Sequence, residues 1–294
     1  MGHDLLNETF IRQRSAELQI PFENLLAASV MEEILRKIAE SEYAENFWMK
    51  DSVRMNLENY RKKADLSLSF CVKDTRGFSY KKAEVSKVFA ELFRNFKKNA
   101  IYWNYHVWMD WNLIYIDMTG TVSFIKVPVK IKLEPVLQEK LEPDIRDMRL
   151  ITNNNRKIQV RCYPAEYVIT EKFFEILSLL ELLNDMSCYM DIYDILRKEA
   201  LSGRKVWELV SEGCRKRGIE AAPERFEILQ SYRTSGFMAK KWKSYLRRAN
   251  KKSPSWDEVM DRVESFFSVI WEHICQNIVY LGDWMPELGR FLDS

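Results

Sequence analysis

The sequence predicts an α+β protein, in which a small sheet with flanking helices over residues 1–162 precedes a helical bundle over residues 163–294. Two observations lead to this prediction. Before residue 163, several segments alternate apolar and polar residues, which is the period of a β-strand. After residue 163, apolar residues recur at three- and four-residue steps, which is the period of an α-helix. With 294 residues, the chain is long enough for two modest domains.

Composition favours a packed globular protein, because 47% of the residues are hydrophobic and 30% are charged. The net charge of +2 excludes a coat of positive charge but permits local basic patches. The five cysteines are scattered without a C-x-x-C pair, as expected for reduced thiols in a cytosolic protein. The stretch MGHDLLNETF lacks the charged-then-apolar pattern of a signal peptide, and no run of the sequence approaches 18 apolar residues. We therefore expect a soluble cytoplasmic protein with no membrane partner.

The first third of the chain predicts helices over 8–41, a short apolar segment over 47–49 and, after a further helical stretch, a strand at ADLSLSF. In ADLSLSF, Leu66, Leu68 and Phe70 alternate with Asp65, Ser67 and Ser69, which indicates a half-buried strand with one polar face. Residues 80–98 return to helical spacing. Their expected apolar side consists of Val85, Val88, Phe89, Leu92, Phe93 and Phe96.

Residues 101–134 read as strands, and Thr119-Gly120 is expected to close a hairpin between two of them. Pro128 is expected at an edge or a bulge, because proline lacks the amide hydrogen that an interior ladder needs. Residues 135–162 are polar and mixed, and they end in the predicted strand KIQVRCY.

From Pro164 onward, nearly the whole chain is predicted to be helical. A clear break at NKKSPSWDE precedes the last helix, with Ser255 as its N-cap and Glu258 three residues further on. The expected helices cover residues 164–184, 189–201, 204–217, 223–231, 235–249 and 255–275.

Five segments carry a resemblance to a known family, and they are FENLLAASVMEEILRKIAESEYAENFWMKDS, ADLSLSF, YPAEYVITEKFFEIL, SCYMDIYDI and KKWKSYLRRANKKSPSWDEVMDRVESFF. In this order along the chain, they resemble segments of the AbiEii-type nucleotidyltransferase toxins. Together they extend the resemblance from about residue 8 to residue 275.

The resemblance implies a nucleotidyltransferase-like mixed sheet with flanking helices over 1–162 and a helical C-terminal domain over 163–294. It also implies a bacterial toxin of a toxin–antitoxin or abortive-infection phage-defence pair. Such a toxin transfers nucleotides from a nucleoside triphosphate (NTP) to an RNA acceptor, with the tRNA acceptor end as the candidate. An antitoxin or another protein partner is expected.

Nucleotidyl transfer needs Mg²⁺ at the triphosphate, and Mg²⁺ prefers carboxylate oxygens. Two carboxylates at positions i and i+2 of a strand point to the same face and can share metal ions. Asp65 stands at the first of these positions, but Ser67 occupies the second. Glu134 fits the place of the third carboxylate, on a later strand. The resemblance therefore assigns the metal to Asp65 and Glu134, with Mg²⁺ binding weakened or lost.

The same resemblance places Lys50, Ser52 and Ser67 at the nucleotide, and Lys172 and Asp191 as catalytic residues that assist transfer. The chain departs from the family pattern at several positions. Asp51 replaces the glycine that lets phosphates approach, and Cys188 and Met190 replace an arginine and a lysine. Lys132, on the same strand face as Glu134, can also neutralise the site. The sequence thus predicts either an enzyme of reduced activity or a non-catalytic relative that binds RNA, a nucleotide or a protein partner.

Each of these residues also has a plain structural interpretation. Asp65 and Ser67 fit the solvent face of an edge strand, and Glu134 fits the end of one. Lys172 fits a surface lysine with an apolar stem on a helix, and Asp191 fits a capping or surface residue.

Two further stretches have alternative interpretations. An aromatic run suits core and hairpin packing, or a platform on which bases stack; its residues are Tyr102, Trp103, Tyr105, Trp108 and Trp111. A basic stretch between residues 240 and 252 suits a solvated helix face, or a track for an RNA backbone through Lys241, Arg247 and Lys251.

Overall fold

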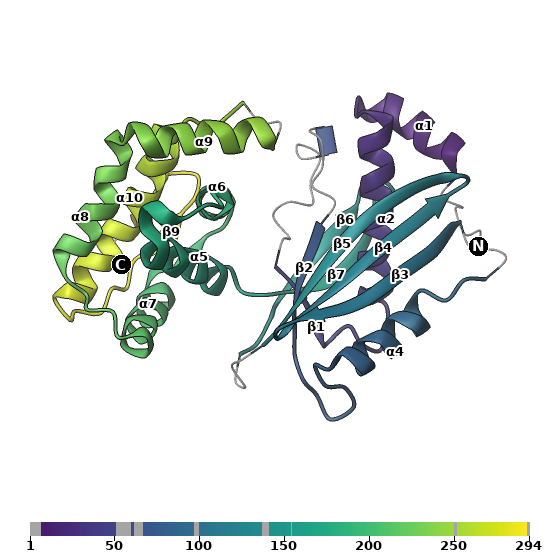
Figure 1. The fold of residues 1–294 in the computed structure, drawn as a ribbon, viewed down its shortest axis with the longest axis horizontal. Coiled ribbons are helices and arrows are strands. Elements are labelled where there is room, and N and C mark those ends of the chain that lie inside the picture. Colours follow the sequence, from purple (N-terminus) through teal and green to yellow (C-terminus); the bar gives the residue numbers. More distant parts are fainter. Residues whose placement is uncertain are drawn as a thin grey trace. The chain divides into compact units, whose positions relative to one another are not determined.

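The computed structural model describes residues 7–50, 60–61, 67–96, 100–136, 141–153, 155–249 and 252–292 (Figure 1). The chain divides into two compact units, Met1–Pro164 and Ala165–Ser294. Unit 1 contains a seven-stranded mixed sheet and unit 2 is largely helical. The predicted α+β class, with a mixed sheet followed by helices, is confirmed.

Unit 1 is built on a sheet of strand order β3-β4-β5-β2-β1-β7-β6. Strand β2 is parallel to β5, β1 is parallel to β7, and the other neighbours are antiparallel. The strands are β1 (Phe47–Met49), β2 (Ser67–Val72), β3 (Ile101–Asp110), β4 (Leu113–Val122), β5 (Ile125–Pro135), β6 (Asp144–Leu150) and β7 (Arg156–Cys162). The strand that contains the end of ADLSLSF is therefore central, and the alternative that Ser67 belongs to an edge strand is wrong.

Three helices of unit 1 contribute to a core on one face of this sheet: α1 (Glu8–Leu18), α2 (Phe22–Ala39) and α4 (Lys82–Leu92). Helix α2 packs on β5 and β7, and α4 packs on β3. The buried side chains of β2 in this core are Leu68, Phe70 and Val72, in step with the alternation in the sequence.

Two expectations for unit 1 were wrong, the first of them for a packing reason. Thr119 and Gly120 lie inside β4, and the turn comes later, at Ser123 with a φ of 55°. A Cβ atom on Gly120 would lie 2.8 Å from a methyl carbon of Val30, so this glycine lets α2 approach the sheet. Helix α4 ends at Leu92, and Phe96 beyond it is exposed rather than on the apolar side.

Two further strand assignments differ from the sequence interpretation. Pro128 pairs with Thr119 of β4 and lies in β5, which is an interior strand between β4 and β2 rather than an edge strand of the sheet. The described pairing of β5 with β2 begins two residues later, at Lys130. Strand β6 was missed, because it is an edge strand whose charged residues Asp144, Arg146 and Arg149 hide the alternation.

Unit 2 is organised around its last long helix, against which the other helices of the unit pack. Its helical elements are α5 (Ala165–Leu179), η2 (Leu180–Leu182), α6 (Ser187–Lys198), α7 (Gly203–Arg217), α8 (Pro223–Ser231), η3 (Tyr232–Thr234), α9 (Gly236–Arg248) and α10 (Trp256–Cys275). The core between α5 and α10 contains Phe173 and Phe267, whose rings stack at 3.8 Å. These elements match the helices predicted after Pro164.

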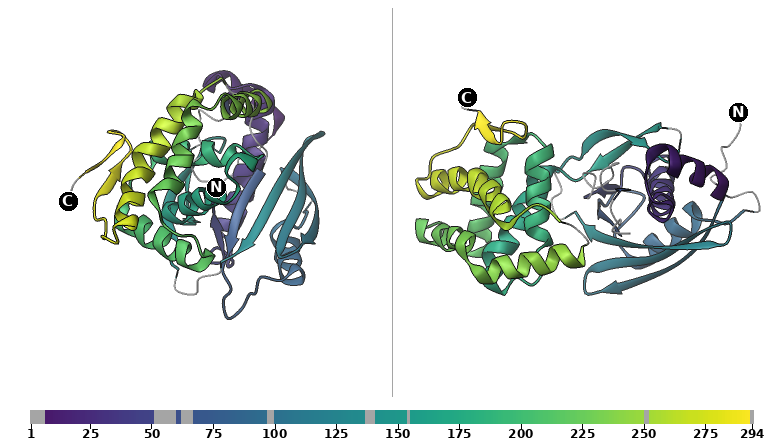
Figure 2. Two further views of the ribbon diagram at one scale, coloured as in Figure 1. Left: turned by 60° about the vertical axis from the view of Figure 1, so that its left-hand side comes forward. Right: turned by 90° about the horizontal axis from the view of Figure 1, so that it is seen from above.

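Three short strands also occur in unit 2, where the sequence predicted none: β8 (Leu201–Ser202), β9 (Asp283–Met285) and β10 (Arg290–Leu292). Figure 2 shows β9 and β10 as a ribbon near the C-terminus. Buried Trp284 anchors this ribbon by donating a hydrogen bond of 2.8 Å to the carbonyl of Leu196. No described strand of five or more residues lies between 170 and 275, in agreement with the expected helical organisation.

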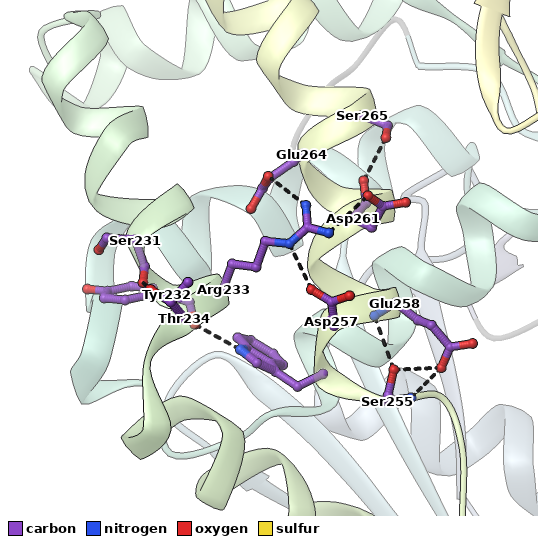
Figure 3. A network of polar contacts seen from close by, with 11 residues as sticks. Ser231, Tyr232, Arg233, Thr234, Ser255, Asp257, Glu258, Asp261, Glu264 and Ser265 are labelled. Atoms are coloured by element: carbon purple, nitrogen blue, oxygen red, sulfur yellow. Dashed lines mark hydrogen bonds and ion pairs between the residues drawn. The ribbon is translucent and has the colours of Figure 1, made fainter.

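The start of α10 is fixed by side chains (Figure 3). Ser255 and Glu258 form the predicted capping box, in which each side chain accepts from the other residue's backbone amide. Arg233 of η3 lies against three carboxylates of the first turns of α10, at 2.8 Å from Asp257, 3.3 Å from Asp261 and 3.4 Å from Glu264. Among the described helices, none is both long and apolar enough to cross a membrane.

Candidate functional site

The candidate site of unit 1 lies on the face of the sheet opposite the helix-covered core. Along β2, Ser67 and Ser69 turn to this face and are half-buried, while Leu68 and Phe70 turn to the core. On β5, Lys130, Lys132 and Glu134 share the same face, because alternate residues of a strand point the same way.

Glu134 is held between two lysines on this face. Its Oε2 lies 2.9 Å from Nζ of Lys50, and its Oε1 lies 2.6 Å from Nζ of Lys132. Lys50 directly follows β1, and its backbone amide donates to the carbonyl of Ser69 at 2.9 Å. The ammonium of Lys50 also lies 5.3 Å from the ring centre of Tyr163. Three strands therefore bring together a carboxylate, two ammonium groups and an aromatic ring.

The two lysines keep Glu134 ionised. Burial by itself raises the pKa of this carboxyl, but the charge of Lys50 and the hydrogen bond from Lys132 outweigh burial and lower the pKa to about 2. Nearby, burial raises the pKa of Tyr80 to about 12. Its neutral hydroxyl donates to the carbonyl of Leu133 at 2.6 Å and accepts from the amide of Ile114 at 3.0 Å. Tyr80 thus braces the strand end that carries Glu134.

The register of the sheet separates Ser67 from Glu134. Ser67 is paired with Lys130, and Cys71 is paired with Glu134. Four residues of strand correspond to about 13 Å. The structure therefore brings Glu134 to Lys50 and not to Ser67. Asp65, Ser52 and Asp51 lie outside the described residues.

The described residues of this site do not fit a Mg²⁺ ion. Both oxygens of Glu134 face an ammonium group, and Ser67 offers only a hydroxyl, whereas Mg²⁺ prefers carboxylate oxygens. Within the described part of the chain, no three His, Cys, Asp or Glu side chains gather in a way that could hold a metal ion. No step of the chemistry is therefore assigned to a metal at Glu134.

In unit 2, the structure brings together the two residues that the sequence selected from α5 and α6. Nζ of Lys172 lies 3.9 Å from Oδ2 of Asp191 and 3.7 Å from Oε2 of Glu175. It also lies 3.9 Å from Sγ of Cys188. Burial raises the pKa of Cys188 to about 12, so this position carries a neutral thiol. The cluster therefore contains one cation and two carboxylates.

The basic stretch forms most of α9, and its members differ in their surroundings. Lys241 donates to the carbonyls of Glu181 and Leu183 at 2.6 and 3.1 Å, and its ammonium lies over the ring of Phe237. Its charge therefore holds the end of η2. Arg247 is exposed and shares a helix face with Lys240 and Lys243. Lys251 lies outside the described residues.

One site residue was missed from the sequence. Tyr163 contacts Lys50 because its backbone amide donates to the carbonyl of Met49 at 3.0 Å, beside the parallel pairing of β1 with β7. The Tyr-Pro pair at 163–164 was visible in the sequence. Its contact with Lys50 depends on a strand pairing between segments more than 100 residues apart, which no local pattern indicates.

The chain thus combines an open mixed sheet, whose central strand has a polar face, with a helical unit that follows it. Known proteins were compared with the chain as a whole. Residues 65–262 match the family described as nucleotidyl transferase AbiEii toxin, type IV toxin–antitoxin system. This match covers more than half of the chain, and the chain belongs to that family. Membership implies an antitoxin protein as partner.

Among solved structures, the chain is similar to the crystal structure of JHP933 from Helicobacter pylori. The two share 10% sequence identity with a TM-score of 0.49, over 87% of this chain and 93% of that chain. None of the curated proteins compared with this chain matches it.

Proposed function

We propose that this protein is a bacterial toxin that transfers nucleotides from an NTP to an RNA acceptor, at a low rate. Its setting is an abortive-infection or phage-defence pair with an antitoxin, and tRNA is the candidate acceptor. The observation that carries the proposal is the polar face of the central strand β2 in a member of the AbiEii family.

In this proposal, Lys50 and Ser52 contact the triphosphate next to Ser67, and Asp65 supplies the main carboxylate. Lys172 and Asp191 assist the transfer. Glu134 contributes little to metal binding, because Lys50 and Lys132 already balance its charge. Ser67 removes one carboxylate, and Asp51 adds a negative charge where phosphates pass. Weak Mg²⁺ binding and slow transfer follow from these three features.

The test is incubation of the purified protein with labelled NTPs, Mg²⁺ or Mn²⁺, and total tRNA. The expected result is little incorporation by the natural protein. Ser67→Asp combined with Asp51→Gly should raise both the Mg²⁺ affinity and the incorporation, and adding Asp65→Ala should abolish the gain. Robust transfer by the natural protein, lost in Asp65→Ala, would refute the low rate but keep the enzyme.

The second candidate function is a non-catalytic member of the fold that binds RNA, a nucleotide or a protein partner. The observation in its favour is the pair of lysines that surrounds Glu134. RNA binding without incorporation, in the natural protein and in the Ser67→Asp, Asp51→Gly variant alike, would establish this alternative.

A further inference from the structure

The open face of β3, β4 and β5 carries an ordered set of side chains that the proposed transfer does not use. Cross-strand pairing arranges them in four rows, each with one residue from every strand. The rows are Trp108–Tyr115–Lys132, His106–Asp117–Lys130, Asn104–Thr119–Pro128 and Tyr102–Thr121–Lys126. We call this surface the β3–β5 face. Its aromatic side chains lie on β3 and β4, and its lysines lie on β5.

The aromatic part of the β3–β5 face is held in a fixed orientation. The rings of Trp108 and Tyr115 stack with centroids 4.4 Å apart and planes inclined by 17°. The indole nitrogen of Trp108 donates to Oδ2 of Asp117 at 2.8 Å, which fixes the indole and engages the carboxylate. Tyr102 lies at the other end of β3 and is 62% exposed. Six residues of strand, about 20 Å, separate Tyr102 from Trp108.

The basic part of the face runs along the neighbouring strand. Lys126 and Lys130 are exposed, and neither forms an ion pair with any other residue that the structure describes. Lys132 is 40% exposed and contacts Glu134. The four rows thus carry three lysines against one aspartate. Strand β5, which carries this excess of positive charge, lies two strands from β3 and about 10 Å from its aromatic side chains.

We propose that the β3–β5 face binds a single-stranded polynucleotide, whose bases stack on Trp108, Tyr115 and Tyr102 and whose phosphates lie over Lys126 and Lys130. An aromatic surface beside a line of cations matches the two parts of a nucleotide. Stacking of this kind requires unpaired bases, since the bases of a duplex are covered by their neighbours. That the bound strand is RNA rests on the proposed function, in which it is the unpaired end of the acceptor.

The β3–β5 face continues into the candidate site. Lys132 belongs to its first row and also contacts Glu134, which Lys50 contacts in turn. A polynucleotide bound along β5 therefore leads toward Lys50, where the triphosphate is proposed to bind. The competing explanation is that Trp108 and Tyr115 only stabilise the hairpin as a cross-strand aromatic pair. That explanation does not account for exposed Tyr102 or for the lysines.

The experiment measures binding of a fluorescein-labelled 12-nucleotide single-stranded RNA to the full chain by anisotropy, without NTP. Parallel arms use DNA of the same sequence and the RNA duplex. Trp108→Ala and Tyr102→Ala should each weaken single-strand binding about tenfold, as loss of one base-stacking contact does. Lys126→Ala combined with Lys130→Ala should reduce the salt dependence of binding. The duplex should bind less tightly than the single strand.

The matched controls are two exposed residues on the other face of the sheet, one in helix α4 and one just beyond its end. Phe96→Ala removes an aromatic ring that is 63% exposed, and Lys87→Ala removes an exposed lysine of α4. Both should bind RNA as the natural protein does. Tyr102 and the two lysines are exposed, so their variants test binding even if Trp108→Ala unfolds the hairpin.

Unchanged binding in the Tyr102 and lysine variants, or equal losses in the controls, would overturn the proposal. Equal affinity for DNA and RNA would support the β3–β5 face as a binding surface but would contradict RNA as its specific ligand. Because NTP is absent, failure of the transferase proposal leaves this result interpretable.

Discussion

Nζ of Lys50 lies 2.9 Å from Oε2 of Glu134, although 84 residues separate them in the chain. This ion pair joins the end of β1 to the end of β5 across β2. It ties a lysine proposed to bind triphosphate to the carboxylate that the family resemblance assigned to the metal. The one carboxylate that the structure describes at this site is therefore fully engaged by ammonium groups of the protein itself.

Replacing Lys50 by alanine should raise the pKa of Glu134. The ordinary pKa is 4.5 and the folded value is about 2, so ionised Glu134 stabilises the fold above pH 4.5, and this stabilisation is lost as the pH falls toward 2. Lys50→Ala should destabilise the protein at pH 7 by about 1–3 kcal/mol and weaken the acid dependence. Denaturant unfolding at pH 7 and pH 3 measures both. Lys130→Ala, on the same strand face, should unfold as the natural protein does at both pH values.

Charge reversal on α9 should weaken tRNA binding. Lys243→Glu combined with Arg247→Glu changes two exposed residues on one helix face. If each contacts a phosphate, the slope of log affinity against log salt should become shallower by roughly 2. Lys241 is a poor probe, because it donates to the carbonyls of Glu181 and Leu183.

The matched control for α9 is Arg215→Glu combined with Lys216→Glu, which makes the same charge change on exposed positions of α7. This control should leave the salt slope unchanged. If both pairs shift the slope equally, the effect is one of net charge and α9 is only a solvated helix face.

Buried Glu32 should make the stability of the protein decrease as the pH rises. Glu32 is 2% exposed and accepts hydrogen bonds from Tyr60, Ile151 and Thr152. Burial nonetheless raises its pKa to about 7 from 4.5. The folded state therefore binds a proton that the unfolded state releases between these values. The associated stability is present below pH 4.5 and is lost as the pH rises through about 7.

Glu32→Gln should remove that decrease, because the amide does not titrate. It should also lower the stability at pH 5 by about 1–3 kcal/mol, since the amide nitrogen cannot accept from the backbone amide of Ile151 or Thr152, whereas the hydroxyl oxygen of the protonated carboxyl can. Free energies of unfolding at pH 5 and pH 8 measure both effects. Glu23→Gln, at an exposed position of the same helix, should keep the natural pH profile. A natural protein equally stable at both pH values would contradict this prediction.

Gly213→Ala should destabilise unit 2. A Cβ atom at this position would collide with the ring of Phe174, so α7 approaches α5 closely only because residue 213 has no side chain. Overpacking of this kind costs about 1–3 kcal/mol. Gly236→Ala is the control, because a Cβ atom there meets nothing within 4 Å. Thermal unfolding of both variants should show a lower midpoint for Gly213→Ala alone.

The sequence by itself determined the elements with strong periodicity. The helices after Pro164 lie where the spacing of apolar residues predicted them, and Ser255 and Glu258 correctly predicted the start of α10. The alternation in ADLSLSF likewise predicted a strand with one polar face. These features are local, because propensity, capping and side-chain period act within one or two turns of chain.

Only the tertiary structure decided what those elements place together. From the sequence, Gly120 was predicted to be a turn residue, yet it lies inside β4. A glycine is needed there because the side chain of Val30 on α2 occupies the space that a Cβ atom would take. Glu134 reads as a metal ligand, yet the pairing of β2 with β5 places it beside Lys50, about 13 Å along the sheet from the register of Ser67. Register and close packing depend on contacts between segments far apart in the chain, and no local pattern encodes them.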